Sequence, residues 1–581
     1  MNLMSPAWVP YHEDVESNPA GYIAPDASGQ NFYDIDPALH HILDLYTPAE
    51  ERAHFTPHLR HMGQVAGNEL DALARTAERH PPVLHARDRF GRDEDWIEYH
   101  GSYREMEKIA FFDTGFQAMT NRAGVMGWPD KLSYITKYAF QYLFVQAEFG
   151  LMCPISATDT SAFLINRYAD PETHALYFDR MTSQDPARFL SGAQFMTEKS
   201  GGSDVGQIEL TAVNEGGEWR LYGEKWFCSA TDGAVGLLLA RPEGAVSGTR
   251  GLALFALPRV CPDGTRNRYR IARLKDKMGT KSMASGELIF NGALAHLLGD
   301  ETKGLKQMMD QVNLSRLSHG VRAAAMMQRC WNEAKAVARN RRAFGKGLME
   351  FPLLRRQLLD VLLPTAQSVS MFAYTAHMMD RAQKGEAHAA KQLRIMTPLL
   401  KYQTARDNIG VAGASMETRG GNGYIEDWVN PRLVRDAHIG VLWEGTSNIN
   451  ALDIITRAVA KEEAHRELQE GIREKLDEVP AQVRGRYQSL MDKAVDFAER
   501  VAREPESEHL CRKASTALYH ATSAALMAWE GATAEAAGKT TNRVALAQLV
   551  EDTRLAPQDP FGADDLGRAG ALVDQALAAS A

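Results

Sequence analysis

The 581-residue chain has few cysteines and no pattern that would use them. Its five cysteines are far apart, and they form neither a CxxC pair nor a cluster with histidine. An odd number of scattered thiols predicts neither a disulfide framework nor a zinc site. We therefore expect no metal, and we expect the cysteines to serve as small apolar residues or inert thiols.

Long apolar runs and a surplus of positive charge are also missing. No stretch reaches about 18 uncharged apolar residues, and residues 1–22 lack a basic segment followed by an apolar one. These absences predict a cytoplasmic protein without a membrane span. The net charge of −9 and the pI near 6.1 argue against a protein that mainly wraps nucleic acid. DNA binding through a local basic patch is an alternative that the charge balance leaves open but does not favour.

Two common nucleotide-binding motifs are absent as well. The chain has no GxGxxG at the start of a βαβ unit and no GxxxxGK[ST]. A nucleotide cofactor must therefore be held in another way. The content of 44% hydrophobic and 24% charged residues is typical of a globular enzyme, and the length predicts roughly three or four domains.

Changes of pattern along the chain predict a mainly α protein with a central antiparallel β domain. Residues 1–187 are interpreted as helical, because apolar residues recur at helical spacing. Residues 188–300 contain short apolar runs between turn clusters, which is typical of β-hairpins. Residues 301–460 return to long helices that predict a bundle, and residues 461–581 add a further helical domain rich in Ala, Glu and Arg.

The stretch VLWEGTSNIN, residues 441–450, places a carboxylate in an unusual position. Glu444 follows two apolar residues and a tryptophan, and a glycine that frees the backbone to turn comes next. A solvated loop glutamate is the simpler interpretation, since buried carboxylates are rare unless they are paired or functional. The remaining motifs decide between the two interpretations.

Four further segments contain residues that could hold a ligand. They are MTEKSGGSDVG (196–206), GEKWFCSA (223–230), NRRAFGKGLMEFP (340–352) and METRGGNGYIEDW (416–428). Taken singly they are weak, because a Gly-rich turn, core aromatics on a strand and a basic pair at a helix end are all common structural features.

In this order, and together with WEGTSNI, the segments resemble the acyl-CoA dehydrogenase family over roughly residues 50–460. Within that family they are most similar to the AidB-like, adaptive-response branch, as are LKDKMGTKSMAS and HPPVLHARDRFGR. The resemblance implies a helical N-terminal domain, a β-barrel-like middle domain and a C-terminal four-helix bundle. The helical segment after residue 460 is additional to that plan.

The resemblance also implies FAD, held by two subunits together. The implied contacts within one subunit are Met196, Thr197, Ser203, Phe227, Ser229, Thr446 and Asn448, and those that reach the cofactor of a neighbouring subunit are Arg341, Phe344, Glu417, Gly420 and Gly421. Ser203, Asn313 and Arg316 are the implied substrate contacts. A shared cofactor implies a homo-oligomer, normally a tetramer, and the family's electron acceptor is an electron-transfer flavoprotein.

Glu444 matches the catalytic base of the family, which removes the α-proton of an acyl-CoA thioester while a hydride leaves the β-carbon for flavin N5. The chain departs from the family pattern at several positions. Ser315 precedes Arg316 where some members have a second base, Pro352 and Glu417 replace two glutamines, Asn313 replaces an aspartate and Ala451 replaces an arginine. These replacements change the adenine and CoA contacts.

Two other functions compete with acyl-CoA dehydrogenation. The departures are shared with the AidB-like branch, which implies the alternative of a flavoprotein associated with DNA and alkylation damage, with little or no dehydrogenase activity. A flavin oxidase similar to the nitroalkane oxidases is a third reading. Those enzymes use an aspartate as base, and Glu444 argues against it.

Overall fold

The structure is a computed structural model that describes residues 23–557 and 566–578. The expectation about the extreme N-terminus concerns residues 1–22 and lies outside the described residues. Within the described part, no helix is long and apolar enough to cross a membrane. The same residues contain no group of three or more His, Cys, Asp or Glu that could hold a metal ion.

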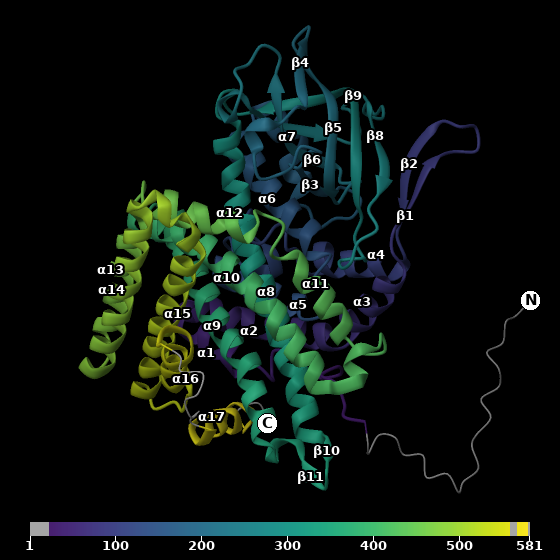
Figure 1. Ribbon diagram of the computed structural model, residues 1–581. Coiled ribbons are helices and arrows are strands. Elements are labelled where there is room, and N and C mark those ends of the chain that lie inside the picture. Colours follow the sequence, from purple (N-terminus) through teal and green to yellow (C-terminus); the bar gives the residue numbers. More distant parts are fainter. Residues whose placement is uncertain (1–22, 558–565, 579–581) are drawn as a thin grey trace, which may run out of the picture.

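The N-terminal region is helical with one interruption. Its helices are α1 (Pro37–Tyr46), α2 (Ala49–Gly67), α3 (Glu69–Arg79), α4 (Gly101–Glu107), α5 (Tyr134–Val145), α6 (Met152–Tyr168) and α7 (Pro171–Met181). The prediction of helix throughout was wrong for residues 83–98, which form a hairpin. The segment HPPVLHARDRFGR supplies β1 (Val83–Arg87) and the turn, and β2 (Asp93–Glu98) follows directly. Burial alternates only along the end of β2, and the left-handed Gly91 forms part of the turn. Figure 1 shows this hairpin projecting from the side of the molecule.

The middle region is a seven-stranded sheet. Its strands are β3 (Gly192–Phe195), β4 (Thr211–Glu215), β5 (Glu218–Ser229), β6 (Val235–Pro242), β7 (Ala253–Pro258), β8 (Tyr269–Leu274) and β9 (Ser285–Leu298). The order is β3-β5-β4-β6-β7-β9-β8, and the extra β5–β9 pairing closes a ring of five strands, as expected for a barrel-like domain. Most pairs are antiparallel, but β6 pairs in parallel with β3 and with β4, which hairpins alone did not predict.

Three long helices form the centre of the third region: α8 (Gly304–Asn340), α9 (Pro352–Gln383) and α10 (Ala387–Arg419). The shorter α11 (Asn430–Ile439) and α12 (Ser447–Leu452) follow. Gly320 on α8 lets α10 approach closely, because an added Cβ would stand 2.4 Å from Leu400 Cγ. From Leu314 onward nearly all of α8 is buried, so residues on it are held rigidly.

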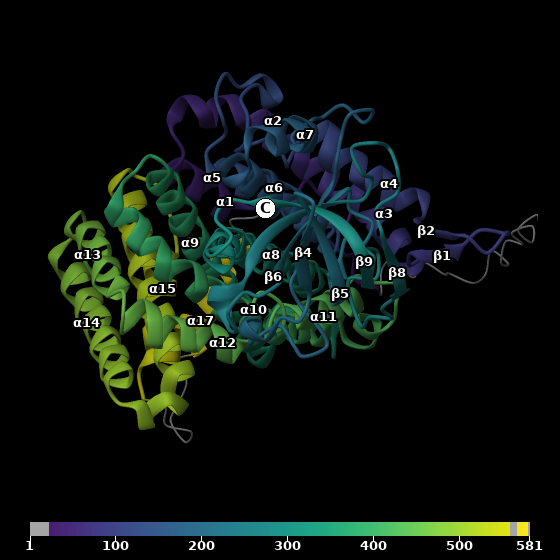
Figure 2. The same cartoon turned by 90° about the horizontal axis from the view of Figure 1, so that it is seen from above.

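The C-terminal helices pack onto the bundle and share its apolar core. They are α13 (Ala464–Asp477), α14 (Ala481–Arg503), α15 (Cys511–Ala536), α16 (Arg543–Val550) and α17 (Leu566–Ala578). Glu530 on α15 is fully buried and accepts hydrogen bonds from Ser370 Oγ on α9 (2.6 Å) and from Arg543 Nη1 (2.7 Å). Figure 2 shows α13, α14 and α15 as a layer beside α9 and α10. The four domain boundaries given above stay predictions.

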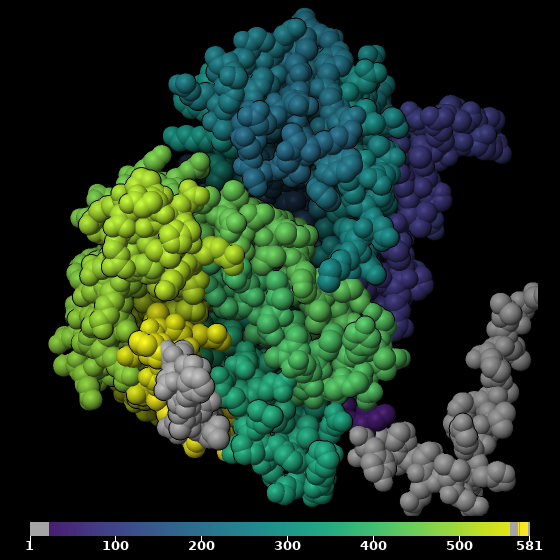
Figure 3. Space-filling view, in the orientation of Figure 1, coloured from purple at the N-terminus to yellow at the C-terminus, as the bar shows by residue number. Residues whose placement is uncertain are grey.

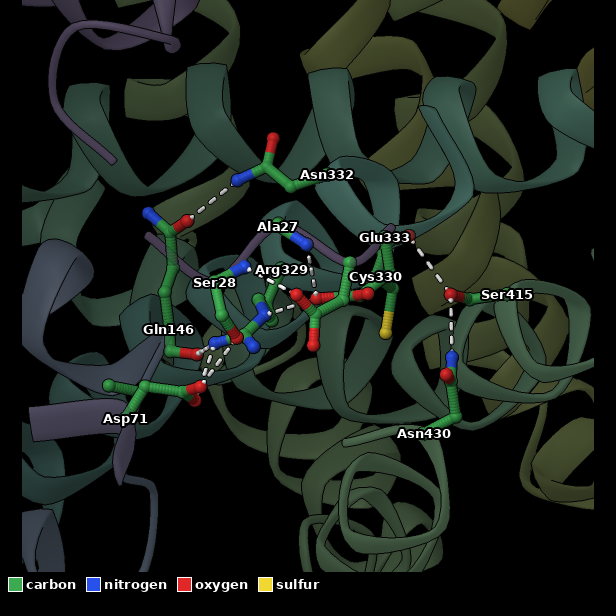
Figure 4. A network of polar contacts seen from close by, with 12 residues as sticks. Ala27, Ser28, Asp71, Gln146, Arg329, Cys330, Asn332, Glu333, Ser415 and Asn430 are labelled. Atoms are coloured by element: carbon green, nitrogen blue, oxygen red, sulfur yellow. Dashed lines mark hydrogen bonds and ion pairs between the residues drawn. The ribbon is translucent and has the colours of Figure 1, made fainter. Parts of the chain in front are cut away.

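A buried polar network ties the N-terminal helices to the bundle (Figure 4). Arg329 on α8 donates to Asp71 Oδ1 and to Glu333 Oε1, both at 2.9 Å. Glu333 Oε1 also accepts from the Ala27 backbone (3.2 Å), and its Oε2 accepts from Arg419 Nη2 (2.7 Å). Buried charges are tolerated only when they are paired in this way. The network therefore fixes the orientation of α8, from which several site residues project.

Candidate functional site

Glu444 lies in the short connection between α11 and α12, where the bundle meets the β domain. Its φ of 55° is in the left-handed region that favours glycine. A non-glycine residue there costs about 1–3 kcal/mol, and such residues gather at functional sites. Gly445, with φ of 93°, continues the turn, and the Thr446 hydroxyl caps α12 by accepting from Ile449 N (3.4 Å). The backbone is thus held in a conformation that aims the Glu444 side chain inward.

The two oxygens of the Glu444 carboxylate have different surroundings. Oε1 accepts from Ser315 Oγ (2.7 Å) and from Arg322 Nη2 (3.1 Å), both on α8. Oε2 is buried and has no hydrogen-bond partner among the described residues. The backbone oxygen of Glu444 accepts from Arg316 Nε (3.2 Å), and Arg316 is paired with Asp453 (2.9 Å). One oxygen is therefore fixed by two residues of α8, and the other is left without a partner among the described residues.

An aromatic wall stands beside the carboxylate. Trp443 stacks on Phe149 with ring centroids 5.8 Å apart, and its Nε1 donates to His319 Nδ1 (3.0 Å). Burial and the charges of Arg322 and Lys401 hold the pKa of His319 well below its ordinary value. His319 is thus a neutral acceptor that orients the indole. Three fixed rings give this side of the site a defined, apolar shape.

A lysine supports the same turn from α10. Lys401 Nζ donates to the Gly445 carbonyl (2.6 Å). Burial lowers the pKa of Lys401 to about 7, although the nearby Glu444 charge acts in the opposite direction. The Glu444–Gly445 turn is therefore anchored by two helices, α8 and α10.

The β domain closes the site from the other side. Ser229 Oγ lies 3.2 Å from Ser285 Oγ, and Lys277 Nζ donates to the Met283 carbonyl (2.8 Å). Burial raises the pKa of the Cys153 thiol, the Arg322 charge acts to lower it, and the Glu444 charge acts to raise it. That thiol, in the first turn of α6, is therefore close enough to Glu444 to feel its charge. Figure 3 shows a hollow in the surface between the β domain and the bundle.

The expected flavin contacts of the β domain lie along one edge. Trp226 N donates to the Thr197 carbonyl (2.8 Å), which places Met196 and Thr197 beside the end of β5. Phe227 on β5 is 54% exposed, unusual for a phenylalanine, and Ser203 lies in an exposed turn. The structure thus brings Met196 and Thr197 to the same edge as Phe227.

Thr446 and Asn448 line a groove of about 520 Å³, together with Arg406 of α10 and Arg512 of α15. Asn313 is half-buried on α8, one turn from Arg316. That Asn313 and Arg316 contact the substrate stays a prediction.

The other expected flavin contacts lie at the far end of the bundle. Arg341 Nη1 donates to the Arg419 carbonyl (3.0 Å), directly before Gly420 and Gly421. Phe344 is 94% exposed on the β10–β11 hairpin (Arg342–Ala343 and Lys346–Gly347), and Glu417 is also exposed. Arg341 follows Ser315 by 26 residues of α8, which at about 1.5 Å per residue is roughly 40 Å. No single cofactor in one chain can contact both ends (Figure 1).

Sequence reasoning missed several residues of the site. Ser315 was noted only as a missing base, and Arg322, His319 and Lys401 were not considered. A usable signal exists, because Ser315, His319 and Arg322 follow one another at helical spacing along one face of a buried helix. A stripe of polar residues on a buried helix face needs partners, and here the partners are Glu444 and Trp443.

Comparison with known proteins agrees with this geometry. The family model for the acyl-CoA dehydrogenase C-terminal domain matches residues 302–460, and that for the middle domain matches residues 193–293. The AidB protein of Escherichia coli K12 is 31% identical over 464 residues, which is 78% of this chain and 81% of the relative. The chain belongs to the acyl-CoA dehydrogenase family. Its residues 23–185 match the N-terminal domain of the adaptive response protein AidB, which places it in the AidB-like branch of the family.

A second family relative comes from Caenorhabditis elegans. Acyl-CoA dehydrogenase family member 11 is 30% identical over 443 residues, 74% of this chain and 71% of the relative. The solved structure of the C. elegans protein ACDH-11, in complex with C11-CoA, superposes with a TM-score of 0.85 at 25% identity and covers 93% of both chains. The family fold, with helical, β and helical regions and extra C-terminal helices, is therefore confirmed.

Proposed function

We propose that this protein is an FAD-dependent acyl-CoA dehydrogenase in which Glu444 removes the α-proton of an acyl-CoA thioester. The observation that carries the proposal is the state of the Glu444 carboxylate. Its Oε1 is fixed by Ser315 and Arg322, whereas its buried Oε2 lacks a partner among the described residues. Buried polar atoms are nearly always satisfied, so a buried carboxylate oxygen without a partner suits a proton acceptor.

The residues present fit FAD. Phe227 offers an exposed aromatic face beside Thr197, and Ser229 offers a hydroxyl at the inner end of the same strand. Thr446 and Asn448 line the groove beside Arg406. When bound, FAD would supply the redox chemistry by accepting the β-hydride at its flavin N5. The protein supplies orientation and the base.

The chain's own residues account for the proton transfer. Ser315 and Arg322 hold the carboxylate in one orientation. The base is therefore already positioned when the substrate binds, and proton transfer does not require a further encounter between free groups. Trp443 and Phe149 form an apolar wall against which an acyl chain can displace water. Lys401 fixes the following carbonyl and so limits movement of the turn.

The substrate class is proposed from the same site and from the family. The C. elegans structure was solved with C11-CoA, which supports an acyl-CoA as ligand here. An electron-transfer flavoprotein as acceptor and a cytoplasmic location stay predictions. Arg341, Phe344 and Gly420 lie too far from Thr446 to share a cofactor within one chain, which supports a homo-oligomer, as in the expected tetramer.

The decisive experiment is anaerobic titration of the flavin-loaded protein with a panel of acyl-CoAs, added one at a time. A substrate should bleach the visible flavin absorbance. The matched control is Glu444→Gln, which keeps the shape of the side chain but cannot accept a proton. If the protein binds flavin but no acyl-CoA bleaches it, the proposed dehydrogenase activity is refuted. The protein would then be a flavoprotein without this activity.

A further inference from the structure

The groove beside Thr446 and Asn448 is built by two parts of the chain that are distant in sequence. Arg406 comes from α10 of the bundle, and Arg512 comes from the first turn of α15, in the segment added to the family plan. Tyr402 connects the two, since its hydroxyl donates to the Arg512 carbonyl (3.1 Å) and its ring lies 5.9 Å from the Arg406 guanidinium. The extra segment is therefore part of the groove wall.

The two arginines are not neutralised by neighbouring carboxylates. Within residues 23–557 and 566–578, neither guanidinium has a carboxylate oxygen within 4.0 Å, whereas Arg394 on the same helix is paired with both Asp453 and Glu462. Asp407 interacts with Arg406 only through its charge, and its carboxylate accepts a hydrogen bond from Gln403 Nε2 (2.8 Å). The groove thus presents two positive charges that the fold leaves available.

The chemistry of the lining matches a pyrophosphate. Guanidinium groups bind phosphate oxygens through paired N–H donors, and such charge-assisted bonds are about twice as strong as neutral ones. The Ser447 hydroxyl and the Asn448 amide lie on the same wall and can donate further bonds. Two cofactors of the proposed reaction contain a pyrophosphate next to adenosine, namely FAD and CoA. Thr446 and Asn448, which match flavin contacts of the family, assign the groove to FAD.

We propose that Arg406 and Arg512 bind the pyrophosphate of FAD, so that the C-terminal segment completes the cofactor site. The inference rests on the proposed function. It also accounts for a difference from the family pattern. Pro352 and Glu417 stand where the family has two glutamines that contact the adenine half of FAD, so this chain lacks their amide donors. A pair of arginines from the same chain would offset that loss. Retention of the cofactor would then depend on correct docking of α15.

The test measures flavin binding to the deflavinated full-length protein by the change in flavin fluorescence. Arg406→Gln and Arg512→Gln should each weaken FAD binding by about 10- to 150-fold, the range expected for loss of a charge-assisted hydrogen bond. Riboflavin, which lacks the pyrophosphate, should bind the parent and both variants equally. Lys513→Gln is the matched control, because Lys513 is exposed, adjacent in sequence and not part of the groove. Gel filtration of each variant checks that the oligomer is intact.

The other outcomes assign the groove differently. Unchanged FAD affinity in both variants, with binding intact in the parent, overturns this inference and leaves the proposed function standing. Weaker binding of a non-reacting acyl-CoA thioether, with FAD binding unchanged, assigns the arginines to CoA. Weaker binding of duplex DNA alone assigns them to a nucleic-acid surface. A parent protein that binds neither FAD nor riboflavin overturns the proposed function together with this inference.

Discussion

Arg322 and Glu444 form an ion pair in the interior of the site, with Nη2 3.1 Å from Oε1. Only 1% of the Arg322 side chain and 14% of the Glu444 side chain are exposed. The guanidinium lies 5.1 Å from the centre of the Trp443 ring, so the same residue touches both the carboxylate and the aromatic wall. Arg322 is therefore a positioning residue for the proposed base.

Replacing Arg322 by methionine should destabilise the protein more than the loss of packing explains. Removing one partner of a buried ion pair leaves an uncompensated charge and typically costs about 3–5 kcal/mol. The added change Glu444→Gln removes that charge, so the double variant should recover part of the loss. A double-mutant cycle on unfolding by denaturant measures the coupling. Additive effects would show that the two residues do not interact in solution.

The variant Glu444→Gln should keep bound flavin but lose bleaching by acyl-CoA. The amide can still accept from Ser315, so the turn should hold its shape, but it cannot take a proton. Loss of a general base typically lowers the rate by about 10²- to 10⁴-fold. Stopped-flow absorbance measures the rate, with the exposed Glu301→Gln as control. Full activity of Glu444→Gln would remove this residue from the mechanism.

Arg341→Ala should lower flavin retention and loosen the oligomer together. The side chain lies roughly 40 Å along α8 from Ser315, so its expected effect on flavin acts through a neighbouring subunit. A charge-assisted contact is worth about 1.5–3 kcal/mol, or roughly 10- to 150-fold in affinity. Flavin content after gel filtration measures both effects, and the neighbouring exposed Arg342→Ala serves as control. An intact, fully loaded oligomer would show that Arg341 is only a surface charge.

The stability conferred by Lys401 should depend on pH. Burial lowers the pKa of Lys401 from its ordinary value of 10.5 to about 7 in the folded state. Between these values the unfolded chain binds the extra proton, so the free energy of unfolding rises with pH across this window. As the pH falls through 7, Lys401 becomes protonated in the folded protein as well. The folded protein must then hold a buried charge, and the stability gained at higher pH is lost. The stability of Lys401→Met, which has no such group, should not follow this pH dependence. Relative to the parent, the free energy of unfolding of Lys401→Met should therefore be most favourable at pH 6 and should become less favourable toward pH 9, as measured by denaturant midpoints at each pH.

Binding to duplex DNA should be weak at physiological salt. Residues 461–581 contain 15 basic and 21 acidic residues, so phosphates would meet a net negative segment. Some of its basic residues are also paired, for example Arg484 with Asp477 (3.6 Å) and Arg486 with Glu551. Six to ten phosphate contacts would make affinity fall about 10³- to 10⁵-fold between 50 and 200 mM salt. We expect dissociation constants weaker than about 10 µM at 150 mM salt. A submicromolar gel shift at that salt, lost when Arg484, Arg486, Arg512 and Lys513 are replaced, would instead favour the DNA-associated function.

Much of the fold could be predicted from local patterns. Short apolar runs such as VGLLLAR and LALFALP became β6 and β7, because a continuous apolar run of a few residues bounded by turn residues is a local signal for a buried strand. Strand β3 and the parallel pairing of β6 could not be predicted, since register between distant strands depends on tertiary contacts. The hairpin at Val83–Glu98 was missed for the opposite reason, because short strands inside a helical region give little periodicity to detect.

The sequence by itself determined the order of helical and β regions, the family and the identity of Glu444, because these depend on residue types at fixed spacing. The tertiary structure decided which residues hold that carboxylate. Ser315 and Arg322 reach it across more than 120 residues of chain, and only the packing of α8 against the α11–α12 turn brings them together. Likewise, Arg512 shares a groove with Thr446 because α15 docks on the bundle. Contacts of this kind are set by burial of the shared core, which no local pattern encodes.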